Sequence, residues 1–147
     1  MSWTGIEIRD ADIRLPAAAL GHGVPGLASL GLSGELELRI ASLSLGRDAA
    51  RMDASVQWRN AASALSPVAP LGDYELALAG TGPEVRAVLR TLQGPLQLGG
   101  AGSWAHGSQP DFLATARVPP DLQPRLVPFL RLVAVEQADG SFVWRPR

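Results

Sequence analysis

Hydrophobic and polar residues alternate along most of the chain with a period of two. Over 34–45, for example, Leu36, Leu38 and Ile40 alternate with charged residues. Because successive side chains of a β-strand point to opposite faces, each such segment has one dry and one solvated face. This pattern is typical of an antiparallel sheet packed on one side. It predicts strands at about 4–9, 10–15, 34–45, 51–58, 74–80, 85–92, 95–104, 112–118 and 141–145.

Local irregularities refine this pattern. The apolar parity slips between Ile40 and Leu43, which predicts a bulge or bend. The Asp139-Gly140 pair predicts a tight hairpin just before the last strand. The motif L-x-G-x-L-x-L occurs at 32–38 and again at 92–98. It indicates either two strands that each begin at a glycine bend or two copies of one β-unit.

Two helical segments are also predicted. Asn60 can cap a short helical turn over 61–65, which Ser66-Pro67 would end. A second, C-terminal helix would cover an open end or face of the sheet. Its apolar face, at helical spacing, comprises Leu122, Leu126, Phe129, Leu130 and Val133.

The start of this C-terminal helix is marked by Asp121 as a fair N-cap and by Pro124, which suits a first turn. Pro128 falls inside the pattern, where proline costs roughly 3 kcal/mol. The helix is therefore expected either to begin near Pro124 or to be kinked at Pro128.

Together these elements predict a mainly β fold. It is a curved antiparallel sheet, or a two-layer β-sandwich or half-barrel, with one C-terminal helix and a short helical turn. The length of 147 residues suits a single domain, and residues 1–147 show no internal boundary. Hydrophobic residues make up 46% and charged residues 18%, which fits a globular domain.

Composition excludes several function classes. The net charge is −1 and the arginines are scattered, so no nucleic-acid partner is expected. The absence of cysteine excludes disulfides, thiolate nucleophiles and thiolate metal sites. The two histidines, His22 and His106, lie in glycine-rich turns that suit solvated loops. We therefore nominate no catalytic residue.

Metal and cofactor motifs are weak. Asp10 with Asp12, and Glu35 with Glu37, share strand faces and would ligate calcium only if further oxygens converged. The solvated face of a sheet is the better interpretation. Residues 100–105 match the dinucleotide pattern G-x-G-x-x-A, but loop residues follow where that motif needs a helix. A glycine-rich strand is favoured, and no metal or cofactor is predicted.

The four tryptophans divide into two pairs. Trp58 and Trp104 share the parity of apolar neighbours, which favours core positions. Trp3 and Trp144 lie near the termini. They could meet on one sheet or be partly exposed and mark a contact patch.

One stretch is much more specific. Residues 58–74 read WRNAASALSPVAPLGDY, which resembles the signature of the type II secretion system protein N family. Two further stretches agree in the order of that family. They are 91–98 followed by Gly100, Gly102 and Trp104, and 130–132 followed by 136–141. Asn60 departs from the acid expected there, and 133–135 lacks an expected glycine.

The resemblance implies a non-catalytic structural or assembly subunit of the bacterial type II secretion system. Such a protein has a short cytoplasmic tail, one membrane helix and a periplasmic β-rich domain. This chain would be the C-terminal periplasmic part, touching the membrane only through an anchor missing from it. Its expected partners are the inner-membrane platform proteins and the outer-membrane secretin. An exposed edge strand could accept a strand of a partner, and the charged face would tune specificity.

The resemblance also nominates motif residues, with either a structural or a partner-contact role. Pro67 and Pro70 would bound a rigid extended segment that serves as a crossover between strands or as a recognition edge. The nominated residues are Trp58, Pro67, Pro70, Leu71, Gly72, Asp73, Tyr74, Gly94, Pro95 and Trp104.

The alternative function, from another class, is a periplasmic lipid or hydrophobic-ligand binding β-groove.

Overall fold

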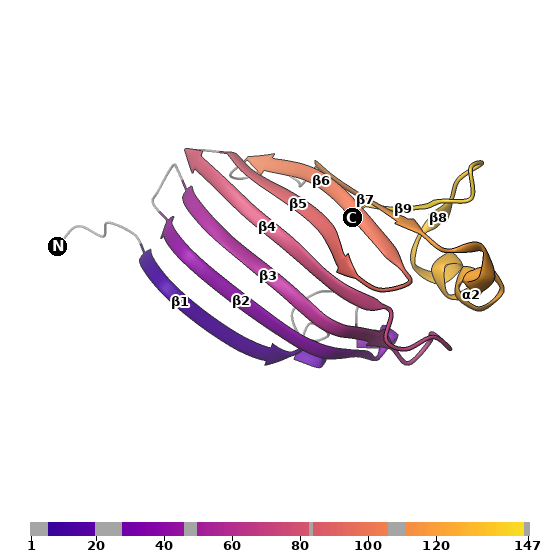
Figure 1. Ribbon diagram of the computed structural model, residues 1–147. Helices are drawn as coiled ribbons and strands as arrows, with labels where there is room; N and C mark the ends of the chain where they lie inside the picture. Colours follow the sequence, from indigo (N-terminus) through magenta and orange to yellow (C-terminus); the bar gives the residue numbers. More distant parts are fainter. Residues whose placement is uncertain (1–5, 20–27, 46–49, 83, 106–110, 146–147) are drawn as a thin grey trace.

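The described strands form one curved, open antiparallel sheet of nine strands (Figure 1). The computed structural model describes residues 6–19, 28–45, 50–82, 84–105 and 111–145. The strand order is β1-β2-β3-β4-β5-β6-β7-β9-β8, so all but the last two strands follow chain order. The strands are β1 Ile6–Pro16, β2 Leu32–Leu45, β3 Ala50–Ser63, β4 Gly72–Gly82, β5 Glu84–Gln93, β6 Gln97–Ala105, β7 Asp111–Arg117, β8 Val135–Glu136 and β9 Phe142–Trp144.

This architecture confirms the predicted mainly β fold and selects the open curved sheet over the two-layer sandwich. The predicted bulge is present, because the β2–β3 register shifts between Ile40 and Ser42. The hairpin is also confirmed, with Gly140 at φ 88 in the turn between β8 and β9. The segments expected at 4–9 and 10–15 are one strand, β1, which continues through Asp10 at φ 52.

The helical turn expected at 61–65 is wrong in position. Residues 61–63 belong to β3, and Asn60 lies at φ 53 in a bulge instead of capping a helix. The Asn60 N–H donates to Asp73 Oδ1 at 2.8 Å, so a carboxylate on β4 stabilises the bulge. Short helical turns do occur, at η1 Ala17–Ala19, η2 Ala28–Leu30 and η3 Pro120–Leu122.

The predicted C-terminal helix is α2, Gln123–Val133. Its N-cap is Leu122 and not Asp121, which lies in the preceding 3-10 turn. Pro124 occupies the first turn as expected, and Pro128 lies inside the helix. The buried side chains of α2 are Leu126, Phe129 and Leu130, three of the five residues predicted to face the sheet.

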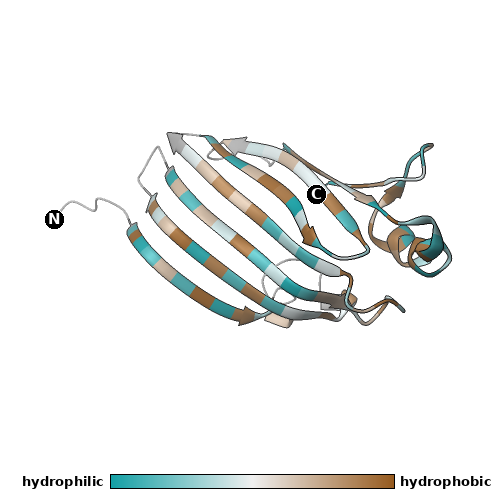
Figure 2. Ribbon diagram, in the orientation of Figure 1, coloured by the Kyte–Doolittle hydropathy of each residue, from teal (hydrophilic) through white to brown (hydrophobic). Residues whose placement is uncertain are grey.

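Hydrophobic and hydrophilic residues alternate along the strands (Figure 2). Because successive side chains of a strand point to opposite faces, this alternation gives the sheet an apolar face and a polar face, and strand pairing aligns residues in rows across it. One row of the apolar face is Ile13, Leu38, Val56, Leu76 and Leu89. The neighbouring row of the polar face is Arg14, Glu37, Gln57, Glu75 and Arg90.

Helix α2 packs on the apolar face, near the edge formed by β9 and β8 (Figure 1). The buried cluster beneath it draws on the helix, the last strands and the turns at one end of the sheet. Its members are Leu71, Leu96, Ala116, Leu126, Phe129, Leu130 and Phe142.

Candidate functional site

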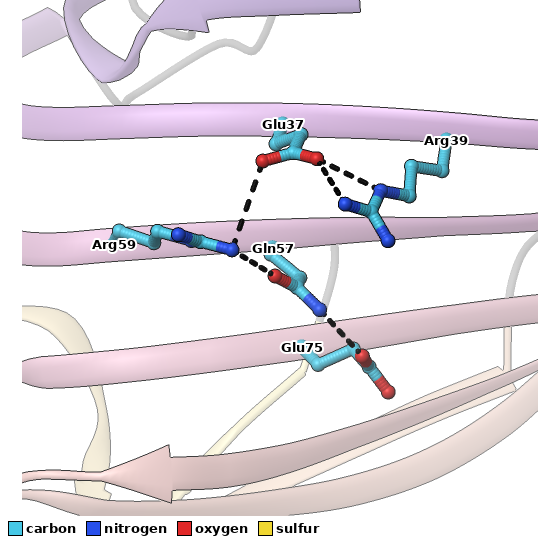
Figure 3. A network of polar contacts seen from close by, with 5 residues as sticks. All are labelled: Glu37, Arg39, Gln57, Arg59 and Glu75. Carbon is cyan, nitrogen blue, oxygen red and sulfur yellow. Dashed lines mark hydrogen bonds and ion pairs between the residues drawn. The ribbon is translucent and has the colours of Figure 1, made fainter. Parts of the chain in front are cut away.

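The polar face carries a network of charged and polar side chains over β2, β3 and β4 (Figure 3). Its centre is Glu37, which is only 2% exposed. Arg39 Nε and Nη2 each lie 2.8 Å from Glu37 Oε1, and Arg59 Nη2 lies 3.7 Å from Oε2. The burial of Glu37 is thus compensated by two guanidinium groups.

The network continues toward β5 through Gln57. Its Oε1 accepts from Arg59 Nη2 at 3.1 Å, and its Nε2 donates to Glu75 Oε2 at 3.1 Å. Glu75 Oε1 in turn lies 3.0 Å from Arg90 Nε and 2.9 Å from its Nη2. We call Glu37, Arg39, Gln57, Arg59, Glu75 and Arg90 the polar network.

The electrostatics of this network do not favour acid–base catalysis. The hydrogen bond from Arg39 lowers the pKa of Glu37, and the charges of Arg39, Arg14 and Arg59 lower it further against the opposing effect of desolvation. A general acid or base needs a pKa moved toward the working pH, whereas Glu37 is moved away from neutrality. The arginines around Glu37 therefore favour its ionised form.

Acid should remove the contribution of Glu37 to stability. Because its folded pKa lies below the ordinary 4.5, that contribution is present above about pH 4.5 and is lost as the pH falls through the folded pKa. Urea unfolding of the wild type and of Glu37→Gln should differ at pH 7, and the difference should shrink as the pH falls below 4.5. Glu84→Gln, at an exposed ion pair with Arg86, should show little difference at either pH. A Glu37→Gln effect independent of pH would contradict this prediction.

The apolar face holds a partly open pocket of about 250 Å³ between the sheet and α2. Its walls come from β2 to β7, β9 and α2, so the sheet must curve around this face to enclose one space. Lining side chains include Trp58, Leu89, Leu98, Ala114, Phe129 and Trp144.

Tyr74 supplies the pocket wall with a phenol whose polar end is already engaged. Its hydroxyl donates to the Leu96 carbonyl at 2.8 Å. Its ring packs edge-on against the Trp58 ring, with 6.4 Å between the ring centroids. Burial, and secondarily the charge of Asp73, raises the pKa of Tyr74 well above its usual 10.0. The phenol stays neutral, and the pocket offers hydrocarbon surface without a free polar anchor from Tyr74.

Most of the nominated motif residues come together at the end of the sheet beside this pocket. Leu71 and Tyr74 are buried, and the Leu71 carbonyl accepts from the Leu96 N–H at 3.1 Å. Asp73 accepts from Gln93 Nε2 at 2.7 Å in addition to the Asn60 N–H.

The glycines of the motif allow two chain segments to touch. A Cβ on Gly72 would lie 2.6 Å from the Gln93 carbonyl oxygen, and one on Gly94 would overlap the Gly72 backbone. Both have a positive φ, 153 and 123 respectively.

The prolines and one tryptophan lie apart from these contacts. Pro67 and Pro70 are exposed in the connection between β3 and β4, next to the partly buried Val68. Pro95 is partly buried after Gly94. Trp104 pairs with Val85 near the far end of β6, so it does not join the others.

The remaining candidates add no metal or cofactor site within the part of the chain that the structure describes. His22 and His106 fall outside the described residues. Within the described ranges, no group of three or more His, Cys, Asp or Glu side chains could hold a metal ion. The G-x-G-x-x-A segment lies in β6 between β5 and β7, where a Cβ on Gly100 would lie 2.5 Å from the Leu113 oxygen. Close backbone approach, predicted for a glycine-rich strand, explains these glycines.

Sequence reasoning missed the burial of Glu37, and it raised an apolar groove as an alternative without locating the pocket or its lining. Glu37 was expected on a solvated strand face, and its neighbours Arg39 and Arg59 cover it only after the strands pair. One signal in the sequence could have indicated this burial: Glu37 and Arg39 carry opposite charges and lie two residues apart on one strand face.

The fold defines a class of protein built on one open antiparallel sheet, with a helix packed against its apolar face at one end. Of the described helices, none has the length and apolar character needed to cross a membrane. The sequence profile of the family described as type II secretion system protein N matches residues 1–145. The chain belongs to that family, and it is a component of the type II protein secretion system. No match was found among curated proteins or solved structures.

Proposed function

We propose that this chain is a non-catalytic assembly subunit that contacts other secretion components in the periplasm through its polar network. Family membership supports the secretion role, and the ordered charges of the polar network carry the proposal of contact. The inner-membrane platform proteins and the outer-membrane secretin are the partners we propose. The nominated motif residues hold the end of the sheet in shape in this proposal.

The polar network suits recognition because its arginines are both exposed and held in place. The side chains of Arg39, Arg59 and Arg90 are 59%, 51% and 63% exposed. Each is already oriented by a glutamate, so little side-chain entropy is lost when a partner binds. Guanidinium groups pair well with carboxylates, and charges at an interface govern specificity and association rate. We therefore expect a partner surface that presents acidic side chains.

A charge reversal tests this surface. Arg90→Glu should weaken binding to at least one periplasmic domain of the platform or secretin roughly tenfold, and added salt should weaken the wild-type complex. The matched control is Arg131→Glu on α2, which is 61% exposed and also pairs with one glutamate, Glu136. Binding would be measured by pull-down and calorimetry, after thermal melts show that both variants fold. Equal binding by the two variants, or no binding to any component, would refute the proposal.

The apolar pocket supports a second candidate, the binding of a hydrophobic ligand. About 250 Å³ is smaller than the roughly 300–1,000 Å³ of sites for drug-sized molecules, which favours a hydrocarbon segment over a whole lipid. Native mass spectrometry of the chain purified from cells would decide this. A retained acyl-chain mass that Ala114→Trp abolishes would support it, and the bare protein mass would count against it.

A further inference from the structure

Strand β1 is the long open edge of the sheet. Among the described residues it pairs only with β2, whereas the opposite edge strand, β8, has two residues. An unpaired edge strand presents a row of free N–H and C=O groups to another strand. Ile13 and Leu15 on this edge are each 43% exposed, so the apolar face also lacks its next neighbour there.

The sheet register fixes which backbone groups of β1 are free. The N–H and C=O of Leu98 both bond to the Thr91 hydroxyl, so they point toward β5. Backbone groups of alternate residues point to opposite sides of a strand, and this alternation can be followed through the pairs from β6 to β1. It directs Asp12, Arg14 and Pro16 outward. Pro16, which has no N–H, therefore lies where it breaks no bond to β2.

The regular part of this edge is bounded on both sides. Asp10 has φ 52, which interrupts the extended backbone, and Pro16 offers no donor. The segment between them is centred on Ile13. A partner strand that pairs with the whole segment between Asp10 and Pro16 is therefore also centred opposite Ile13.

We propose that the occupant of this edge is β1 of a second copy of the chain, antiparallel and related by a two-fold axis at Ile13. Asp12 then faces Arg14 of the second copy, and the two exchange both backbone hydrogen bonds. Ile13 faces itself as a pair without backbone bonds, and Ala11 faces Leu15. The two sheets become one continuous sheet.

Charge complementarity selects this occupant. Within one copy, Asp12 is paired with Arg39 and Arg14 with Glu37 across β1 and β2. The second copy adds Arg14 beside Asp12 and Asp12 beside Arg14. Each row therefore alternates in sign across the junction, and opposite charges directly across a strand pair are stabilising. The sequence of β1 is its own complement in this register.

The apolar face is completed at the same time. Ile13 meets its own copy, and each Leu15 meets a small Ala11, so large and small side chains alternate along the junction. The rows that end at 43% exposed Ile13 and Leu15 continue into the second copy. A closed two-fold pair also removes the open edge that could otherwise recruit further chains.

Cysteine cross-linking tests the register, because the chain has no cysteine of its own. In Ile13→Cys, the two introduced residues face each other with Cα atoms roughly 4.5 Å apart, within the range of a disulfide. In the matched control Leu15→Cys, equally exposed on the same face, they lie roughly 13 Å apart along the strands. Mild oxidation should cross-link Ile13→Cys at least about tenfold more than Leu15→Cys. Equal yields, or a higher yield at position 15, would overturn the proposal.

Charge swapping tests the complementarity. Asp12→Arg and Arg14→Asp should each weaken dimerisation about tenfold in sedimentation equilibrium, because each places like charges at both symmetric contacts. The double variant should restore it. Within each copy of the double variant, the new charge at position 12 still repels Arg39 and the new charge at position 14 still repels Glu37. Recovery must therefore come from the contact between copies. Failure of the double variant to recover while its thermal melt shows a folded chain would overturn the proposal.

The oligomeric state of the wild type is a further test. A wild-type chain that stays monomeric at all accessible concentrations overturns self-pairing. Cross-linking of position 13 to another secretion component instead of to a second copy also overturns it. These measurements use the chain alone and the edge of the sheet. They are therefore independent of the pull-down, which tests the polar network, and either proposal can fail without the other.

Discussion

Phe142→Ala is expected to lower the free energy of unfolding by about 3–5 kcal/mol, the usual cost of removing a buried phenylalanine. Phe142 is 1% exposed and lies in the cluster beneath α2. Its strand, β9, has three residues, and Phe142 pairs with Ala116 on β7 and with Glu136 on β8. The empty volume should loosen both β9 and the helix.

Urea unfolding followed by tryptophan fluorescence would measure the loss. Leu132→Ala on α2 is the control, because Leu132 is 69% exposed and its truncation should cost less than about 0.5 kcal/mol. Hydrogen exchange should show the amides of α2 losing protection in Phe142→Ala before those of β2 and β3. An unchanged midpoint for Phe142→Ala would show that the cluster does not hold the helix.

Gly94→Ala is expected to destabilise the protein by about 3–5 kcal/mol, from backbone strain and steric overlap together. Gly94 has φ 123, a region that residues with a Cβ rarely adopt. The added Cβ would overlap the Gly72 backbone and lie 2.8 Å from the Leu71 oxygen. The β5–β6 turn would have to move away from the start of β4.

Gly140→Ala separates the two causes. Gly140 also has a positive φ of 88, but a Cβ there meets nothing within 4 Å. It should therefore cost only the conformational part, roughly 1–2 kcal/mol. Thermal melts of both variants would give the difference, and equal losses would show that close approach at Gly94 contributes nothing.

These glycines explain why the two quoted motif stretches occur together. Gly72 belongs to the first stretch and Gly94 to the second, and their backbones lie in contact. Tyr74 of the first stretch donates to Leu96 of the second. These contacts support the structural role that we propose for the motif residues.

The sequence by itself determined the local elements. The alternation of Leu36, Leu38 and Ile40 predicted a strand, the parity slip after Ile40 predicted the bulge, and Asp139-Gly140 predicted the hairpin. Helical spacing located α2, and the stretch at 58–74 identified the family. Each of these signals is short-range, because side-chain direction and turn geometry depend on residues close together in the chain.

Tertiary structure decided the rest. The end of β3 was predicted as helix because Asn60 suits an N-cap, but Asp73 on the next strand binds its N–H and stabilises a bulge. The choice of an open sheet over a sandwich, the burial of Glu37 beneath Arg39 and Arg59, and the pocket under α2 all depend on which strands pair and how the sheet curves. Strand pairing and curvature join residues far apart in the chain, and no local pattern of residue types records them.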